Sequence, residues 1–270
     1  MTSVKSRSEK VRNVFVTAGV VLAVFVPIWF LAAALGTKFG VWTWQVGLLK
    51  MVGGIGVPLI GLTILVTFIT SLLVVFVTPR SGFKGLSAMW LVSLAATGLA
   101  LSAIGAAKAV PPIHDISTDT QNPLTFSAKV MTQRGANSNK ILPPNEATVP
   151  FNREKLNDWS GRSLLEIQAD AFPAIKPLVI EGQTPAAIFD KARSAAKSQG
   201  LKIVSEDTTA LRLEAVAESF WFGFKDDVVI AVTPIANGGQ VDMRSVSRVG
   251  ISDLGANAKR IEAFLTAMKG

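Results

Sequence analysis

Long apolar stretches separated by short polar loops fill the first 110 residues of the chain, and the remaining 160 residues contain none. The three stretches run from about 14 to 35, from 52 to 77 and from 86 to 110, and Lys108 is their only charged residue. Each exceeds the roughly 20 apolar residues that cross a bilayer core of about 30 Å. We therefore expect residues 1–110 to form a membrane anchor with three transmembrane helices.

Shorter, alternating patterns follow from residue 183 onward and predict a compact core over 183–270. Thr184 and Pro185 begin a predicted helix that ends near Gly200. Four strand-like runs cover 201–206, 209–219, 227–235 and 239–249, and a last helix, capped by Ser252 or Asp253, covers about 254–268. The predicted fold class is three transmembrane α-helices followed by an exported α+β domain, in which two helices pack on a four-stranded antiparallel sheet.

The segment 111–182 joins the anchor to this core and is rich in Pro, Asn and Thr. Its lack of sustained periodicity predicts a long irregular segment that wraps the core, with one short helix near 162–172. The soluble domain as a whole is expected to span 111–270.

Charge is distributed unevenly between the two halves. Residues 1–110 carry nine Lys and Arg against one acidic residue, whereas residues 111–270 carry eighteen of each sign. A neutral soluble half argues against nucleic-acid binding, which depends on clustered positive charge. Basic residues mark the cytoplasmic ends of membrane helices. Most of them precede the first stretch or lie between the second and third: Lys5, Arg7, Lys10, Arg12, Arg80 and Lys84.

This asymmetry predicts a cytoplasmic amino terminus and, after three crossings, a carboxyl-terminal domain in the periplasm of a bacterial inner-membrane protein. An alternative is that the first stretch is a cleaved signal peptide, with Ala32 and Ala34 at the cleavage site. Its apolar run exceeds the usual 7–15 or so residues, which favours a retained helix. The domain is exported under either interpretation.

The first candidate cluster lies just after the third stretch. The sequence has no cysteine and one histidine, which excludes thiolate chemistry and disfavours a metal site, a catalytic triad or a cofactor. One interpretation is a metal-dependent or acid/base hydrolase that uses His114, Asp115 and Asp119. The other is structural, with polar side chains that satisfy backbone N–H groups. The cluster consists of His114, Asp115, Thr118, Asp119 and Asn122.

The second candidate cluster combines three arginines with a helix amino terminus. An anionic lipid headgroup or envelope polymer is one possible ligand for Arg244, Arg248, Asp253, Asn257 and Arg260. The alternative is an internal salt-bridge network, in which Arg244 and Arg248 pair with Asp226, Asp227, Asp242 or Asp253. A third possibility is that Asp115 or Asp119 pairs with Arg248 or Arg260 and docks the exit segment onto the domain.

Two apolar features predict contacts rather than chemistry. Gly98, Ser102 and Ala106 recur every four residues and form a small-residue stripe for helix packing. Trp221 lies with Phe222 and Phe224 in an aromatic cluster, for which core or interface packing is favoured over a ligand platform. The expected partners are the lipid bilayer and another membrane protein.

Two motifs resemble a family of bacterial membrane and exported proteins, with plastid relatives, that is known as a domain of unknown function. The first is ISTDT at 116–120, followed by Asn122-Pro123, and the second is DMRSVSRVGISDLGANAKRI at 242–261; FKDD at 224–227 also matches. Leu124 departs from the pattern, where another proline is expected. The resemblance covers about 112–268 and implies a fold and an envelope location. It implies no activity, substrate or catalytic residue.

These observations together predict a membrane-anchored periplasmic module that binds or assembles with other envelope components. The alternatives are the hydrolase described above and an accessory subunit of a membrane transporter. Buried charges that mark ion pathways are absent from the three stretches, which favours an anchor over a transporter.

Overall fold

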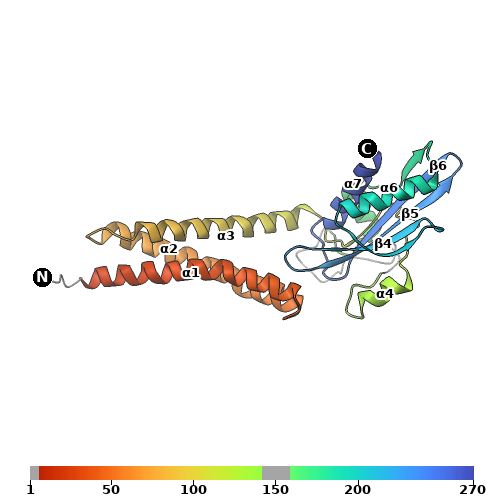
Figure 1. Cartoon of the computed structure of the whole chain (residues 1–270). Helices are drawn as coiled ribbons and strands as arrows, with labels where there is room; N and C mark the ends of the chain where they lie inside the picture. The colour runs from red at the N-terminus through yellow and green to blue at the C-terminus, as the bar shows by residue number, and fades with distance from the viewer. Residues whose placement is uncertain (1–5, 142–158) are drawn as a thin grey trace. The chain divides into compact units, whose positions relative to one another are not determined.

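The computed structural model describes residues 6–141 and 159–270 and divides into two compact units. One consists of Met1–Gly105 with Phe220–Gly223, and the other of Ala106–Ser219 with Phe224–Gly270. The first unit is helical and the second contains a β-sheet (Figure 1). Three apolar helices followed by a sheet-containing domain therefore confirm the coarse architecture that the sequence predicts.

The helical unit contains three helices that are long and apolar enough to cross a membrane. Helix α1 covers Arg7–Lys38, the π-helical segment η1 covers Gln45–Gly56 and continues into α2 at Val57–Phe76, and α3 covers Phe83–Ala109. The second helix begins at Gln45, seven residues before the predicted stretch. The added residues include Lys50, the only charged residue between Gln45 and Val52, and it does not interrupt the helix.

Small and polar side chains hold this unit together. The Thr67 and Ser93 hydroxyls lie 3.2 Å apart between α2 and α3, and both side chains are buried. Arg12 of α1 is also buried, and its guanidinium donates to the carbonyl oxygens of Val77 and Pro79 just after α2. A cation here compensates the unpaired carbonyl groups at a helix carboxyl end.

The sheet has six strands rather than the predicted four, so that part of the fold prediction is wrong. The four predicted runs correspond to β3 (Lys202–Asp207), β4 (Arg212–Glu218), β5 (Lys225–Ile235) and β6 (Gly238–Ser247). Two short strands, β1 (Asp115–Ser117) and β2 (Leu178–Glu181), pair antiparallel with the two ends of β6. The strand order is β1-β6-β5-β4-β3, with β2 beside β1 on the same edge of β6.

Both additional strands belong to the segment 111–182. Strands of three and four residues are too short for an alternation pattern to identify, and both depend on pairing with β6. The same segment contributes α4 (Ala128–Arg134) and α5 (Leu164–Ala171), the latter with a capping box between Ser163 and Glu166. The predicted residues 142–158 of the wrapping segment lie outside the described residues.

One face of the sheet is covered by α6 (Pro185–Ser198) and α7 (Ala256–Lys269) (Figure 1). The Thr184 side chain accepts the Ala187 N–H, as expected of an N-cap. The N-cap of α7 is Gly255 rather than the predicted Ser252 or Asp253. The apolar core lies between these helices and alternate residues of the strands. The helices contribute Ile261 and Phe264 of α7, and the strands contribute Leu213, Val228, Ile230, Val241 and Met243.

The opposite face of the sheet lies under α4 and is largely polar. Val228 faces the helical core, so its neighbours Asp227 and Val229 point to the other side. The Arg134 guanidinium of α4 contacts Asp227 there. This opposite face carries most of the residues that the sequence marks as candidates.

Candidate functional site

Strand β6 places the candidate residues on two different sides of the sheet. Met243 and Ser245 point toward α7, whereas Asp242 and Arg244 point to the α4 side, because side chains alternate along a strand. Arg248 follows the last residue of β6. The second predicted cluster is therefore divided by the sheet into two separate networks.

The first ion pair on the α4 side joins Arg244 to Asp115. Arg244 donates from Nε and Nη2 to the two carboxylate oxygens, at 2.9 and 2.7 Å, and from Nη1 to the Leu124 carbonyl at 2.9 Å. The arginine side chain is 3% exposed. This bidentate geometry uses the donors that an anionic ligand would need.

Asp227 forms the centre of the second ionic group on this side. Its carboxylate is fully buried and accepts from Arg134 Nη1 at 2.6 Å and from Arg248 Nη2 at 2.6 Å and Nε at 3.0 Å. Burial lowers the pKa of the Arg134 guanidinium, and the attraction of Asp227 opposes that shift. One carboxylate thus pairs with two guanidinium groups in the interior, and the three side chains together keep a formal charge of +1.

The helix side contains a hydrogen-bonded group around Asn257 of α7. The fully buried Asn257 amide donates at 3.0 Å to the His114 carbonyl and at 3.0 Å to the Ser247 hydroxyl. Its oxygen accepts from the Ser245 hydroxyl at 2.6 Å. Arg260 joins the group through Ser245 at 2.7 Å and pairs with Asp226 at 2.7 Å. These contacts fix the start of α7 on the sheet.

Asp253 acts at the same helix start. Its two carboxylate oxygens accept the backbone N–H groups of Gly255, at 2.7 Å, and Asn257, at 2.9 Å. It therefore satisfies the free donors of α7 without occupying the N-cap position. Burial raises the pKa of the Asp253 carboxyl, and these N–H groups partly offset the effect.

The exit-segment cluster is dispersed over several contacts. The His114 ring lies 3.1 Å from the Ile251 carbonyl through Nδ1, and the Thr118 hydroxyl donates to buried Asp242 at 2.8 Å. One oxygen of Asp119 accepts the backbone N–H groups of Gln121 and Asn122, each at 2.9 Å. Within the described ranges, 6–141 and 159–270, no group of three His or carboxylate side chains is arranged to hold a metal ion.

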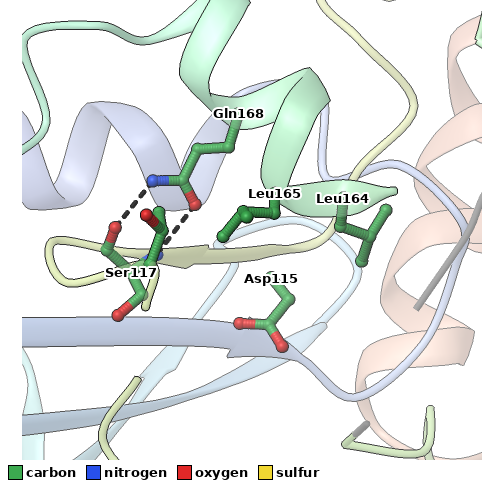
Figure 2. Close-up of a pocket in the computed structure, with 6 residues that line it drawn as sticks. Asp115, Ser117, Leu164, Leu165 and Gln168 are labelled. Atoms are coloured by element: carbon green, nitrogen blue, oxygen red, sulfur yellow. Dashed lines mark hydrogen bonds between the residues drawn. The ribbon is translucent and has the colours of Figure 1, made fainter. Parts of the chain in front are cut away.

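A small hollow beside β1 has Asp115 at its edge, but it has room for about one water molecule. The residues around it are Asp115, Ser117, Thr120, Leu164, Leu165 and Gln168. Figure 2 shows that the Gln168 side chain lies against the backbone of Ser117. Its oxygen accepts the Ser117 N–H at 3.1 Å and its amide donates to the Ser117 carbonyl at 2.6 Å. Gln168 thus pairs with the outer side of β1 as another strand would.

The structure contains one pair that the internal network suggests, Arg248 with Asp227, but it gives Arg244 a different partner. Asp115 pairs with Arg244, and Asp119 contacts only nearby backbone N–H groups among the interactions described here. Sequence reasoning missed Arg134 and Gln168, which both lie in the segment expected to be irregular. The only local signals were the Ser127 cap before α4 and the capping box of α5.

A family model described as "Protein of unknown function (DUF1499)" matches residues 115–268. This range contains every candidate residue of the sheet domain except His114, and it confirms the predicted resemblance to a domain of unknown function. No curated protein matches the chain.

Proposed function

Since this chain belongs to the DUF1499 family of proteins of unknown function, we propose its role from its own residues: a membrane-anchored binding or assembly module of the bacterial cell envelope that is not evidently catalytic. Three apolar helices support the anchor. The excess of basic residues before α1 and between α2 and α3 supports a cytoplasmic amino terminus and a periplasmic domain.

The observation that carries this proposal is the internal pairing of the candidate arginines. Arg244, Arg248 and Arg260 each contact a carboxylate of the same domain at 2.6–2.7 Å. A catalytic or ligand site needs polar groups that converge on open space. Here the polar groups converge on each other, so the proposed binding takes place on surfaces of the protein.

The second half of α3 is one such surface. Gly98, Ser102 and Ala106 are exposed, and no atom lies within 4 Å of a Cβ built on Gly98. Leu99 and Leu101 are also exposed, so this half of the helix is covered by lipid or by a partner. A helix of another membrane protein fits a stripe of small residues, which allows close backbone approach.

Reporter fusions at the carboxyl end test the location. Alkaline phosphatase should be active and green fluorescent protein should be dark, because each reports the compartment in which it folds. The reverse pair of signals would place the domain in the cytoplasm and contradict the proposed location.

Native electrophoresis of the full chain, extracted in a mild detergent, tests assembly. Gly98→Leu should release the protein from a larger complex, because a leucine on the stripe prevents close helix contact. Ala100→Leu, on the opposite side of the same helix, is the matched control and should leave the complex intact. Equal migration of both variants and the parent would count against assembly through this stripe.

His114→Ala separates the module from the hydrolase alternative. The backbone carbonyl of His114, rather than its ring, accepts from Ser247 and Asn257. We expect this variant to fold and to complement a deletion strain as well as the parent does. A folded variant that fails to complement would favour the hydrolase.

A further inference from the structure

The start of α1 and the α2–α3 connection form a basic end of the helical unit with little compensating negative charge. Its basic residues in the described part of the chain are Arg7, Lys10, Arg12, Arg80 and Lys84. Against these five cations stands Glu9, the only acidic residue among the first 110, which leaves a formal charge of +4. Every ion pair found within residues 6–141 and 159–270 lies in the sheet unit. The basic end therefore lacks an internal counter-charge of the kind that neutralises the arginines of the sheet.

Arg12 joins the two segments that form the basic end. It is only 3% exposed, and its Nη1 donates to the carbonyl oxygens of Val77, at 3.2 Å, and of Pro79. These contacts tie the first turns of α1 to the residues that follow α2. Arg80 comes next in the chain and is exposed, and its Nε donates to the Val75 carbonyl at 2.9 Å. Arg12 thus holds the connection that carries Arg80.

The start of α3 is held against the same part of α1. Cβ atoms built on Gly82 and Gly85 would lie 2.9 and 2.8 Å from the Val16 side chain, one turn after Arg12. Glycine at both positions permits this close approach, because it has no Cβ. Lys84 lies between the two glycines and is exposed. Its ammonium group therefore belongs to the same end of the unit as Arg12.

Exposed apolar side chains begin directly beside these cations. Phe83 precedes Lys84 and is 51% exposed, and Val14 follows Arg12 by two residues and is 63% exposed. Phe76, the last residue of α2, is 76% exposed. A phospholipid has the same division, with apolar chains next to a charged headgroup. The basic end therefore matches an anionic phospholipid both in charge and in the order of its polar and apolar parts.

We propose that the basic end binds the headgroup phosphate of an anionic phospholipid through Arg80 and Lys84. This inference rests on the proposed anchoring of the chain in a membrane. Arg12 is a positioning residue, because its burial keeps it from the headgroup while it holds the connection in place. Each Lys or Arg near an anionic membrane surface strengthens binding about fivefold, so the two exposed cations together supply about 25-fold.

The lipid is favoured over a soluble acidic partner because of the apolar side chains beside the cations. A soluble protein at Arg80 and Lys84 would leave Phe76 and Phe83 uncovered, whereas the acyl chains of a bound lipid cover them. The phosphate also supplies negative charge where this unit has only Glu9. One ligand thus satisfies both features of the surface.

Native mass spectrometry of the full chain in detergent tests the proposal. The titrants are phosphatidylglycerol and phosphatidylcholine with identical acyl chains, so that only the net charge and shape of the headgroup differ. Glycerol phosphate, which has the charge without the chains, is the third probe. The parent should bind phosphatidylglycerol about 25-fold more tightly than phosphatidylcholine. Glycerol phosphate binding as tightly as phosphatidylglycerol would indicate a site for a soluble anion and overturn the lipid proposal.

A pair of double variants locates the site. Arg80→Gln with Lys84→Gln should weaken phosphatidylglycerol binding about 25-fold and leave phosphatidylcholine binding unchanged. The matched control is Lys38→Gln with Lys50→Gln, which removes the same charge from the last residue of α1 and from η1. The control should keep the preference of the parent. Equal losses in the two double variants would reveal a general charge effect and overturn the proposed site.

Flotation of the parent with liposomes of phosphatidylcholine alone tests the anchoring separately, because this lipid has no net charge. A parent that floats but binds the two lipids equally in the spectrometer would overturn the lipid site and leave the anchor standing. A parent that stays at the bottom of the gradient would contradict the proposed anchoring itself.

Discussion

Asp227 is the buried counter-charge of two arginines, and replacing it by Asn removes that negative charge. The Asp227 side chain is completely buried, and the Arg134 and Arg248 side chains are 2% and 14% exposed. An asparagine keeps the shape but leaves two guanidinium groups close together without a counter-charge. Breaking a buried ion pair from one side costs about 3–5 kcal/mol, and we expect a loss in that range.

Arg134→Met is the matched control for this substitution. It removes one guanidinium but leaves the contact between Arg248 and Asp227, in which Nη2 lies 2.6 Å from the carboxylate. Methionine fills much of the same volume, so the expected loss is about 1.5 kcal/mol, near the lower value for a hydrogen bond to a charged group. The ratio between the two losses tests the reasoning better than either value alone.

Urea unfolding of the full chain in detergent, followed by pulse proteolysis of the sheet domain, measures both variants. With a denaturant slope of about 2–3 kcal/mol/M, Asp227→Asn should lower the urea midpoint by about 1–2.5 M. An unchanged slope is required for the comparison. An Arg134→Met loss equal to or larger than that of Asp227→Asn would refute the argument that Asp227 is the shared counter-charge of both arginines.

Three further outcomes follow from the same contacts. Gln168→Ala should cost about 1–3 kcal/mol in the urea assay, because it leaves a buried N–H and C=O of β1 unpaired; a loss below about 0.5 kcal/mol would contradict that role. Folding raises the pKa of Asp253, so the folded state binds this proton more tightly than the unfolded state does. Protonation removes the free-energy cost of burying the charged carboxylate, and it proceeds as the pH falls from the raised pKa toward 3.8. The stability of the parent should therefore rise relative to Asp253→Asn over that range, and a difference independent of pH would exclude the effect. Leu254→Asn should gain up to about 1 kcal/mol by relieving the strain at a φ of 56°, whereas a loss would show that the leucine packs inside the domain.

Sequence patterns predict the elements that are long enough for a hydrophobic period to repeat several times. The three apolar helices and the run from Thr184 to the last helix were found because each spans several turns or an alternating strand. The short strands β1 and β2 carry three and four residues, and β6 alone determines their register. No local pattern reports such a pairing, which is why two strands were missed.

The partners of the candidate residues could not be predicted from local sequence patterns either. The run from Asp242 to Arg260 was recognised as special, but the choice between an anion site and an internal network depends on partners distant in sequence. Arg134 lies 93 residues from Asp227, and Asp115 lies 129 residues from Arg244. Formal charge neutrality of the domain favoured internal pairing, but it identified no pair.

Strand β1 and Gln168 also protect one edge of the sheet from pairing with another chain. A free strand edge offers backbone groups to which a neighbouring chain can add, and this promotes aggregation. Along β6 that edge is divided between two very short strands, and a glutamine side chain occupies the backbone groups of Ser117. At the other edge, the register of β3 shifts between Ile203 and Ser205, which interrupts a regular template. Both of these edges are therefore poor templates for the addition of a strand from a second chain.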